Sequence, residues 1–433
     1  MSRELFGTDG VRGLAGQFPL DKDGMVRIGR AVGTRFAEEN QSVVIGHDPR
    51  ESSDELLKNI IEGLNSVGVN VIDAGILPTP GIAYLTREHD VFVAGIMITA
   101  SHNPYTYNGV KVFSSTGDKL SDATETELND LIINGVHDRG NGSLNSDTSL
   151  VKEYEDFIVS SAGDMKLNKL SIAIDASNGA ASGLAAKVFE RLGANVTPLY
   201  DQPNGVNIND NCGATDTSNL LKVVNAQKLS LGVAVDGDAD RLIMVDNLGR
   251  EVKGDYILYI LAVAGNLQGV VATVMSNLGF EDSLKAKGIA LVRTKVGDRY
   301  VLEGLAQTGY KLGGEQSGHI IMSDLLRTGD ALLAAVQTVK AVAASGKSLA
   351  EWCDEVELLP QSVINIPLQD KSRLDSEEVK AFMAQKSAEM GDAGRVFIRA
   401  SGTEPLARIM VEAPDADATA QKIAEELKKL VNN

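Results

Sequence analysis

At 433 residues the chain is too long for one hydrophobic core, and 43% hydrophobic with 23% charged residues is the composition of an ordinary globular protein. The formal net charge of −18 argues against nucleic acid or an anionic membrane as the main partner, but a local group of Arg and Lys can still bind a small anion. The two cysteines, Cys212 and Cys353, form no CxxC pair, and the N-terminus shows no apolar signal core. We therefore expect a cytoplasmic protein in a reducing compartment, with no membrane contact.

A strand–helix–strand pattern occurs three times, over residues 43–76, 170–201 and 269–298. In each copy an apolar strand ends in a small or polar loop, an amphipathic helix follows, and a second strand comes after a Gly. This order is typical of a mostly parallel α/β sheet. The sequence therefore predicts three related α/β domains.

Three breaks in the pattern set the expected domain boundaries. Residues 137–149 are polar and rich in turn formers, so we expect a linker there, and a softer break falls near 249–255. Residues 357–370 lead into a final segment of about 70 residues that is too short for another copy and predicts a smaller α+β domain. The predicted domains are 1–150, 151–253, 254–360 and 361–433.

Chemistry in such folds is found in loops after apolar strands, and the chain offers several of them. Near the N-terminus, Arg12 lies between glycines in FGTDGVRG, where we expect a flexible loop, and alone it carries little weight. The apolar run 91–98 then leads into TASHNP, residues 99–104. Ser, Asn and Pro form turns, so a plain turn is one interpretation; the other is a functional Ser101 exposed at the strand end.

Three aspartates stand in the stretch LGVAVDGDADRLIMVD, whose flanks are apolar. Such carboxylates cannot pack in a dry core without a cation, and their alternate spacing in extended chain would place them on one side. The EF-hand pattern fails because its sixth and twelfth positions are Arg241 and Asn247. Mg²⁺ fits best, with a solvated acidic turn as the alternative. The three residues are Asp236, Asp238 and Asp240.

Two further loops carry polar groups suited to a phosphosugar. KLGGEQSGHI offers an acceptor and a hydroxyl in Glu315 and Ser317, although a glycine-rich turn explains it equally well. VFIRASGTEPLARIM combines guanidiniums with small hydroxyl residues around a Gly, as a phosphate site requires; a β-turn with surface arginines is the alternative. Its candidate residues are Arg399, Ser401, Gly402, Thr403 and Arg408.

Taken together, these loops favour phosphoryl transfer. A metal ion facing a serine hydroxyl suits transfer through a phosphoserine, because the ion neutralises charge while the serine holds the phosphoryl group between two half-reactions. Ser101 is therefore predicted to be the nucleophile and phosphate carrier.

The loops, in this order and across essentially the whole chain, resemble the α-D-phosphohexomutase superfamily. The resemblance implies four domains around a central cleft, the first three built alike. FGTDGVRG, TASHNPYTYNGVKVF, NGVNINDNCGATD, RTKVGDRYV and above all GEQSGH resemble the branch that acts on glucosamine phosphates. One departure is Ala239, where many members have Gly; because its side chain need not touch the metal, we expect a small geometric effect.

The resemblance also implies roles for individual residues. Ser101 would be phosphorylated and would transfer its phosphoryl group in converting glucosamine 6-phosphate to glucosamine 1-phosphate through a 1,6-bisphosphate. One Mg²⁺ would be held by the three aspartates and an oxygen of that phosphate, with Arg241 steadying the region. Glu315 and Ser317 would bind sugar hydroxyls, and the Arg399–Arg408 loop would hold the non-reacting phosphate. The candidates for proton transfer and charge stabilisation, which the sequence leaves unranked, are Arg12, His102, Lys111 and His319.

Several alternatives remain open on the sequence. The preferred sugar could be glucose or mannose phosphate, although Gln316 favours the glucosamine branch. The protein could also be a Mg²⁺-dependent phosphosugar-binding protein without turnover, or a phosphatase. The sequence also leaves open whether the chain is a homodimer, and whether a sugar 1,6-bisphosphate or a kinase first phosphorylates Ser101.

Overall fold

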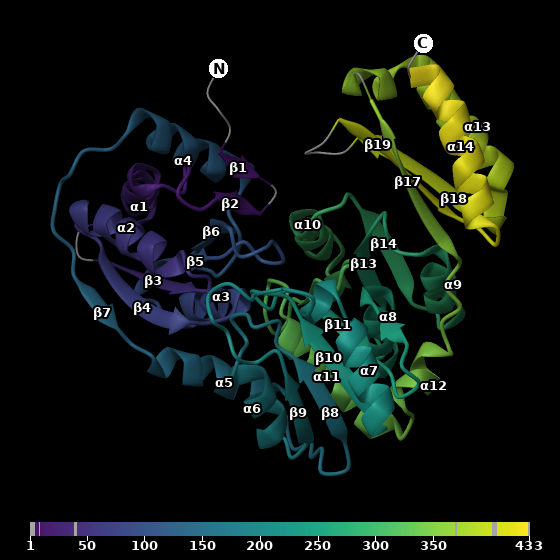
Figure 1. Cartoon of the computed structure of the whole chain (residues 1–433), viewed down its shortest axis with the longest axis horizontal. Coiled ribbons are helices and arrows are strands. Elements are labelled where there is room, and N and C mark those ends of the chain that lie inside the picture. The colour runs from purple at the N-terminus through teal and green to yellow at the C-terminus, as the bar shows by residue number, and fades with distance from the viewer. Residues whose placement is uncertain (1–4, 8, 39–40, 369, 401–404, 432–433) are drawn as a thin grey trace. The chain divides into compact units, whose positions relative to one another are not determined.

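The computed structural model describes residues 5–7, 9–38, 41–368, 370–400 and 405–431 (Figure 1). The chain divides into two compact units: Met1–Met275 with Ile289–Cys353, and Ser276–Gly288 with Asp354–Asn433. One β-sheet falls in each of the ranges 1–150, 151–253, 254–360 and 361–433, and we keep these ranges as the proposed domains. The three larger sheets mix parallel and antiparallel pairs, and the last is antiparallel.

The first sheet has the strand order β1-β2-β6-β5-β3-β4-β7. Strand β5 (Phe92–Ile98) is an almost continuous buried apolar run, as expected for a strand covered on both faces. The predicted linker 137–149 is only partly a linker, because β7 (Leu144–Ser146) lies within it and pairs parallel with β4, whose edge would otherwise be unpaired. The other elements are β1 (Phe6–Gly7), β2 (Gly10–Leu14), β3 (Ser42–His47), β4 (Asn70–Ile76), β6 (Tyr107–Ser114), α1 (Lys22–Phe36), α2 (Ser53–Ser66), α3 (Thr79–Glu88) and α4 (Asp122–Asn134).

The second sheet has the order β12-β11-β10-β8-β9, with parallel pairing from β10 through β9. Strand β10 (Leu231–Val235) is buried along its whole length, and its carboxyl end leads into the three aspartates. The remaining elements are β8 (Ser171–Asp175), β9 (Asn195–Leu199), β11 (Leu242–Val245), β12 (Glu251–Val252), α5 (Ser149–Ser161), α6 (Leu184–Arg191) and α7 (Ser218–Gln227).

The third sheet has the order β14-β13-β15-β16, in which only the β15–β16 pair is antiparallel. Helix α11 (Ala331–Ser345), which is rich in Ala and Val, is a core helix. The other elements of this part are β13 (Gly269–Thr273), β14 (Ala290–Thr294), β15 (Leu312–Gly314), β16 (Ile320–Met322), α8 (Gly254–Ala264), α10 (Asp298–Thr308) and α12 (Leu349–Cys353).

The second compact unit contains the antiparallel sheet β17-β19-β18. Its core is formed by the sheet and two helices, one of which, α14, buries Ile423 and Leu427 along one face. The elements of this unit are α9 (Leu278–Ala286), β17 (Gln361–Pro367), α13 (Glu377–Met390), β18 (Arg395–Ala400), β19 (Leu406–Glu412) and α14 (Ala416–Val431).

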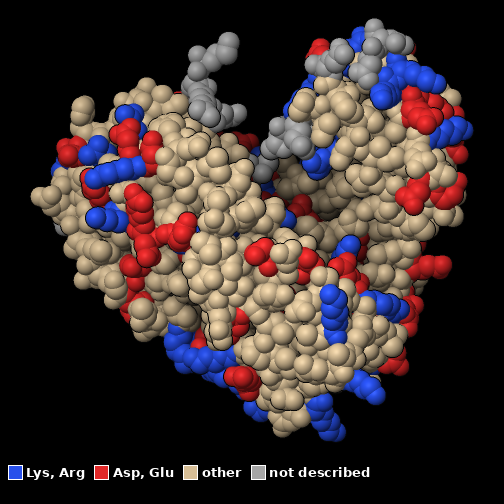
Figure 2. Space-filling model, viewed as in Figure 1, with Lys and Arg blue, Asp and Glu red and all other residues tan. Residues whose placement is uncertain are grey.

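Among the described residues, no helix is both long enough and apolar enough to cross a bilayer. On the face shown in Figure 2, acidic and basic side chains are interspersed and the described residues form no broad basic area. This surface agrees with the excess of 59 Asp and Glu over 41 Lys and Arg.

Asp330 caps the N-terminus of α11 and gives the fold a pH-dependent element. Its carboxylate is buried, accepts from the Leu333 N–H at 2.9 Å and from the Tyr154 hydroxyl at 2.9 Å. Burial raises the pKa of Asp330 to about 7, above the usual value of 3.8. Between about pH 4 and pH 7 the folded chain therefore holds a proton that the unfolded chain has released, so this group stabilises the fold less as pH rises.

We expect Asp330→Asn to remove that dependence, because Asn keeps an oxygen for the cap and does not titrate. Relative to the wild type, the variant should therefore have a higher thermal midpoint at pH 7 than at pH 5. The slope for one such group is at most about 1.4 kcal/mol per pH unit. The exposed Asp324→Asn serves as the control, and parallel pH curves for Asp330→Asn and the wild type would contradict the assignment.

Candidate active site

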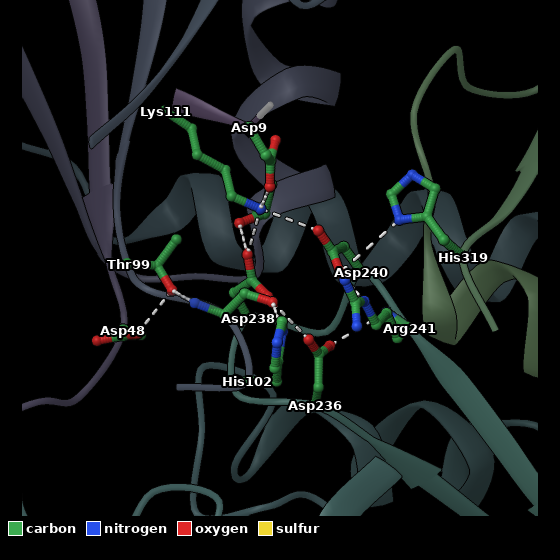
Figure 3. A network of polar contacts seen from close by, with 12 residues as sticks. Asp9, Asp48, Thr99, His102, Lys111, Asp236, Asp238, Asp240, Arg241 and His319 are labelled. Atoms are coloured by element: carbon green, nitrogen blue, oxygen red, sulfur yellow. Dashed lines mark hydrogen bonds and ion pairs between the residues drawn. The ribbon is translucent and has the colours of Figure 1, made fainter. Parts of the chain in front are cut away.

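Three of the predicted loops meet in the first compact unit, each at the carboxyl end of a strand. Ser101 follows β5, the three aspartates follow β10, and Glu315 follows β15. Figure 3 shows the centre of this meeting point, where side chains from three sheets face one another. The polar residues are therefore gathered as the strand-end argument predicts.

Ser101 is directed at the aspartates, but it is buried, not exposed as the sequence suggested, with 1% of its surface accessible. Its hydroxyl donates to Asp236 Oδ2 at 2.7 Å and lies 3.2 Å from Nδ1 of His102. Its φ of +51° is a left-handed conformation that disfavours any side chain. Such strain costs about 1–3 kcal/mol and persists only where neighbouring contacts hold it in place.

The contacts that hold the Ser101 loop come from Arg50 and Asp48, which the sequence analysis did not single out. The buried Arg50 guanidinium donates to the carbonyl of Ser101 at 2.9 Å and pairs with Asp48 at 2.8 Å. Thr99 donates to Asp48 at 2.7 Å and accepts from the Ser101 N–H at 2.9 Å. The signal that could have found them is HDPR, another polar stretch directly after an apolar strand, β3.

The three aspartates lie on a tight turn and not on extended chain as predicted. The chain reverses between β10 and β11, with the Ala239 N–H donating to the Asp236 carbonyl at 3.0 Å. Ala239 has a φ of +56°, a left-handed backbone conformation in which Gly is unstrained and Ala is not. Any effect of Ala at this position therefore acts through the backbone, and its small size stays a prediction. The turn brings one oxygen of each carboxylate within 4.8 Å of the others.

This carboxylate cluster fits a divalent cation. Burial, together with the nearby charges of Asp240 and Asp238, raises the pKa of Asp236 to about 8, so the three groups do not all carry charge without a compensating cation. The buried Oδ1 atoms of Asp238 and Asp240 have no hydrogen-bond partner among the described residues. Three close carboxylates, two of which have a buried oxygen without a hydrogen bond, are the donor set of a hard ion such as Mg²⁺.

Lys111 lies against the same cluster from strand β6. Its Nζ is 2.8 Å from Asp238, 2.9 Å from Asp240 and 2.8 Å from Asp9. Burial alone would lower the pKa of Lys111, but these three carboxylates raise it well above its usual value. Asp238 also accepts from the Thr79 hydroxyl at 2.6 Å. Lys111 is therefore a fixed cation in this site.

The other candidates for proton transfer differ in charge and place. Burial and the nearby cations Arg241 and Arg12 lower the pKa of His102 to about 4, so its ring is neutral near pH 7 and able to accept a proton. Arg12 is on strand β2 and not on a flexible loop, and it donates to Asp9 at 2.8 Å. The backbone N–H of Arg241 donates to Asp236 at 3.1 Å.

The third loop contributes Glu315, Ser317 and His319. Glu315 accepts from the Gly297 N–H at 3.0 Å, and the exposed Ser317 hydroxyl is 3.3 Å from Glu315. Burial would lower the pKa of His319, but its contact with Asp240, whose Oδ1 is 3.8 Å away, raises it. Leu242 of β11 donates to the Gly318 carbonyl at 3.0 Å, which anchors this loop beside the three aspartates.

Gly237, between the first two aspartates, is required for the approach of the serine loop. A Cβ at this position would lie 2.6 Å from the Ser101 carbonyl oxygen. We expect Gly237→Ala to separate the serine from Asp236 and to lower kcat by about 10²-fold, because small misplacements in a reactive geometry have effects of that size. Steady-state kinetics would test this. Gly232→Ala serves as the control, because Gly232 is also closely packed but lies within β10, away from the serine loop. Equal losses of kcat in the two variants would show that Gly237→Ala acts through protein stability alone.

In the second unit, Arg399 and Arg408 are direct cross-strand partners in the β18–β19 pair. Burial and the charge of Arg408 lower the pKa of Arg399. Like charges opposite each other destabilise a sheet, and an anion between them would relieve this. The predicted Ser401, Gly402 and Thr403 lie outside the described residues.

The chain matches all four domains of the phosphoglucomutase/phosphomannomutase family. These are α/β/α domain I over residues 3–137, α/β/α domain II over 152–249, α/β/α domain III over 253–359 and the C-terminal domain over 363–430.

The fold is shared with solved structures of that family. One is a phosphoglucomutase/phosphomannomutase family protein from Burkholderia thailandensis, with a TM-score of 0.81 and 24% identity, covering 100% of this chain and 98% of the other. Another is the Aspergillus fumigatus N-acetylphosphoglucosamine mutase in complex with GlcNAc-6P and magnesium. It has a TM-score of 0.65 and 18% identity, covering 94% of this chain and 99% of the other.

Curated relatives match the sequence from end to end. A phosphoglucosamine mutase of Thermus thermophilus is 43% identical over 99% of this chain and 98% of its own length. A phosphoglucosamine mutase of Delftia acidovorans is 44% identical over 100% of this chain and 99% of its own. The chain belongs to the phosphoglucosamine mutase family, within the α-D-phosphohexomutases.

Proposed function

We propose that this protein interconverts glucosamine 6-phosphate and glucosamine 1-phosphate through a phosphoserine at Ser101 and a 1,6-bisphosphate. The observation that carries the mechanism is the Ser101 hydroxyl held 2.7 Å from Asp236 within a buried carboxylate cluster. The sugar is supported by end-to-end identity of 42–44% to phosphoglucosamine mutases.

The phosphoryl group moves in two balanced steps. First the sugar O1 attacks the phosphorus of phospho-Ser101, the P–Oγ bond breaks, and the O1 proton is transferred to Oγ. The bisphosphate then turns over in the site, Oγ attacks the phosphorus on O6, the P–O6 bond breaks, and the Oγ proton passes to O6. Glucosamine 1-phosphate leaves and Ser101 carries phosphate again.

In this scheme His102 mediates the proton transfer and Lys111 stabilises charge. His102 is within 3.2 Å of Oγ and neutral, so it can take and return the proton. Lys111 is permanently protonated and cannot act as a base near pH 7. Arg12 and His319 are assigned to charge stabilisation.

We assign one Mg²⁺ per chain to Asp236, Asp238, Asp240 and an oxygen of the phosphate on Ser101. When bound, the ion supplies positive charge that neutralises the transferring phosphoryl group. Arg241 is assigned to steadying the phosphoserine region.

We assign the sugar hydroxyls to Glu315 and Ser317. The non-reacting phosphate is assigned to Arg399 and Arg408 with Ser401, Gly402 and Thr403, supported by the cross-strand arginine pair. We further propose that the protein acts in the cytoplasm as a homodimer. Ser101 is first phosphorylated by a sugar bisphosphate or by a kinase.

Phosphorus NMR tests the reaction and the sugar together. The protein, Mg²⁺ and a trace of sugar bisphosphate are incubated with glucosamine, glucose or mannose 6-phosphate in separate tubes. We expect the 1-phosphate to form fastest from glucosamine 6-phosphate, without free phosphate. Faster conversion of glucose or mannose phosphate would change the sugar, free phosphate would indicate a hydrolase, and no conversion in any tube would leave a binding protein.

A further inference from the structure

Outside the residues assigned above, two further charged side chains lie largely shielded from water next to the site. Lys119, which follows β6, forms ion pairs with Asp9 and with Asp298, the first residue of α10. The side chains of Lys119, Asp9 and Asp298 are 14%, 19% and 11% exposed, so these pairs are largely shielded from water. Asp298 lies in RTKVGDRYV, a stretch to which the proposed function gives no role.

These pairs close a ring in which acidic and basic side chains alternate. Lys111 is 2.8 Å from Asp9 and 2.9 Å from Asp240, and His319 lies 3.8 Å from Asp240 and 3.5 Å from Asp298. Figure 3 shows four of the members, Asp9, Lys111, Asp240 and His319, around the carboxylate cluster. We call the complete set the charge ring: Asp240, Lys111, Asp9, Lys119, Asp298 and His319.

The charge ring joins three sheets. Asp9, Lys111 and Lys119 come from the first sheet and its loops, Asp240 from the turn after β10, and Asp298 and His319 from the part built on the third sheet. Lys111 and His319 are its members with proposed roles in charge stabilisation. Asp9 contacts Lys111 and Asp298 contacts His319, so each of these two members has a carboxylate of the ring beside it.

Lys119 pairs with both of these carboxylates. It shares the charge of Asp9 with Lys111 and with Arg12, and Lys111 in turn lies between Asp238 and Asp240. Without Lys119, Asp9 would keep only Lys111 and Arg12 as cationic partners, and Asp298 would face His319 without a lysine. Buried charges that lose a partner rearrange or take up another one.

We propose that Lys119 and Asp298 are positioning residues for phosphoryl transfer, which hold Lys111 and His319 in place through the charge ring. This inference rests on the proposed function, because turnover is one of its readouts. The competing interpretation is that the ring only holds the sheets together.

A neighbouring ion pair separates the two interpretations. Arg327 pairs with Asp118 at 2.8 Å, one residue before Lys119, and joins the same two parts of the chain outside the ring. Arg327→Gln therefore removes a more exposed ion pair between the same two parts of the chain and leaves the charge ring intact. The test compares Lys119→Met, Lys119→Arg, Asp298→Asn and Arg327→Gln in the full-length, phosphorylated, Mg²⁺-loaded enzyme.

We expect Lys119→Met to lower kcat by about 10- to 100-fold, the range found for residues that orient catalytic ligands, with KM changed by less than about threefold. Lys119→Arg should recover most of the activity, and Arg327→Gln should resemble the wild type. If Lys119→Met does not fold, the double variant Lys119→Met/Asp298→Asn, which removes both charges, takes its place. Equal losses in Lys119→Met and Arg327→Gln, or no rescue by Lys119→Arg, would overturn the proposal.

A second measurement needs no turnover. The chain has five histidines, so the ring nitrogens can be followed by ¹⁵N NMR and the His319 signal assigned with His319→Gln. Asp298→Asn should shift the His319 signal, and Arg327→Gln should not. If the His319 signal does not move in Asp298→Asn, the charge ring itself is overturned. If the wild type converts no hexose phosphate, the proposed function is overturned, but the NMR result on the charge ring still holds.

Discussion

Ser101→Ala should lower turnover by at least about 10⁴-fold, the largest effect expected of any single change in this chain. The variant keeps the backbone and the left-handed conformation at position 101 but has no oxygen to carry the phosphoryl group. Because the Arg50 contacts reach the carbonyl of residue 101 and not its side chain, the loop should keep its shape. Intact mass and thermal unfolding would show an unphosphorylated, folded protein.

Ser177→Ala is the matched control for this change. Ser177 is also buried, also follows a strand, β8, and also has a positive φ, +54°, but its hydroxyl donates to the Ala176 carbonyl and not to the carboxylate cluster. We expect it to keep near-normal activity. Near-normal turnover by Ser101→Ala itself would exclude a phosphoserine at this position.

Asp238→Asn should show the second-largest effect, a loss of about 10²-fold or more in Mg²⁺-dependent turnover. The substitution removes one of three charges that would hold the ion and one of the carboxylates that pair with Lys111. Asn keeps an oxygen that can accept from Thr79, so the local fold should survive.

The readout that does not depend on turnover is the thermal midpoint with and without Mg²⁺. An ion bound to the folded state at 100 times its Kd stabilises it by about 2.7 kcal/mol, so the wild type should show a clear upward shift and Asp238→Asn a much smaller one. Asp246→Asn is the control, since Asp246 is a buried carboxylate of the same sheet that pairs with Arg250 outside the cluster. An unchanged Mg²⁺ response in Asp238→Asn would place the metal elsewhere.

The sequence predicts those parts of the site whose residues can be identified within one short stretch of chain. Ser101, the three aspartates and Glu315 each stand directly after an apolar strand, so their type and position show in a short stretch. The α/β order likewise shows in the repeated pattern of strand, loop and helix. Membership of the phosphohexomutases, indicated by the same stretches, is confirmed by the family matches.

What the sequence could not supply depends on contacts between distant segments. Lys119 and Asp298 are 179 positions apart, and nothing in the spacing of either shows that they pair. Arg50 acts on a loop 51 residues away, so its role appears only once β3 and β5 lie side by side. The burial of Ser101 and the sign of φ at Ala239 are likewise consequences of packing and not of the local residue types.

The most direct test of the account is to follow the phosphoryl group itself. Enzyme labelled with ³²P on Ser101 is mixed with glucosamine 6-phosphate and Mg²⁺, and samples are quenched over the time of one turnover. We expect the label to leave the protein at least as fast as kcat, to appear first in the bisphosphate and then in the monophosphate, and not to appear as free phosphate. Label that stays on Ser101 while the sugar phosphate is converted would contradict it.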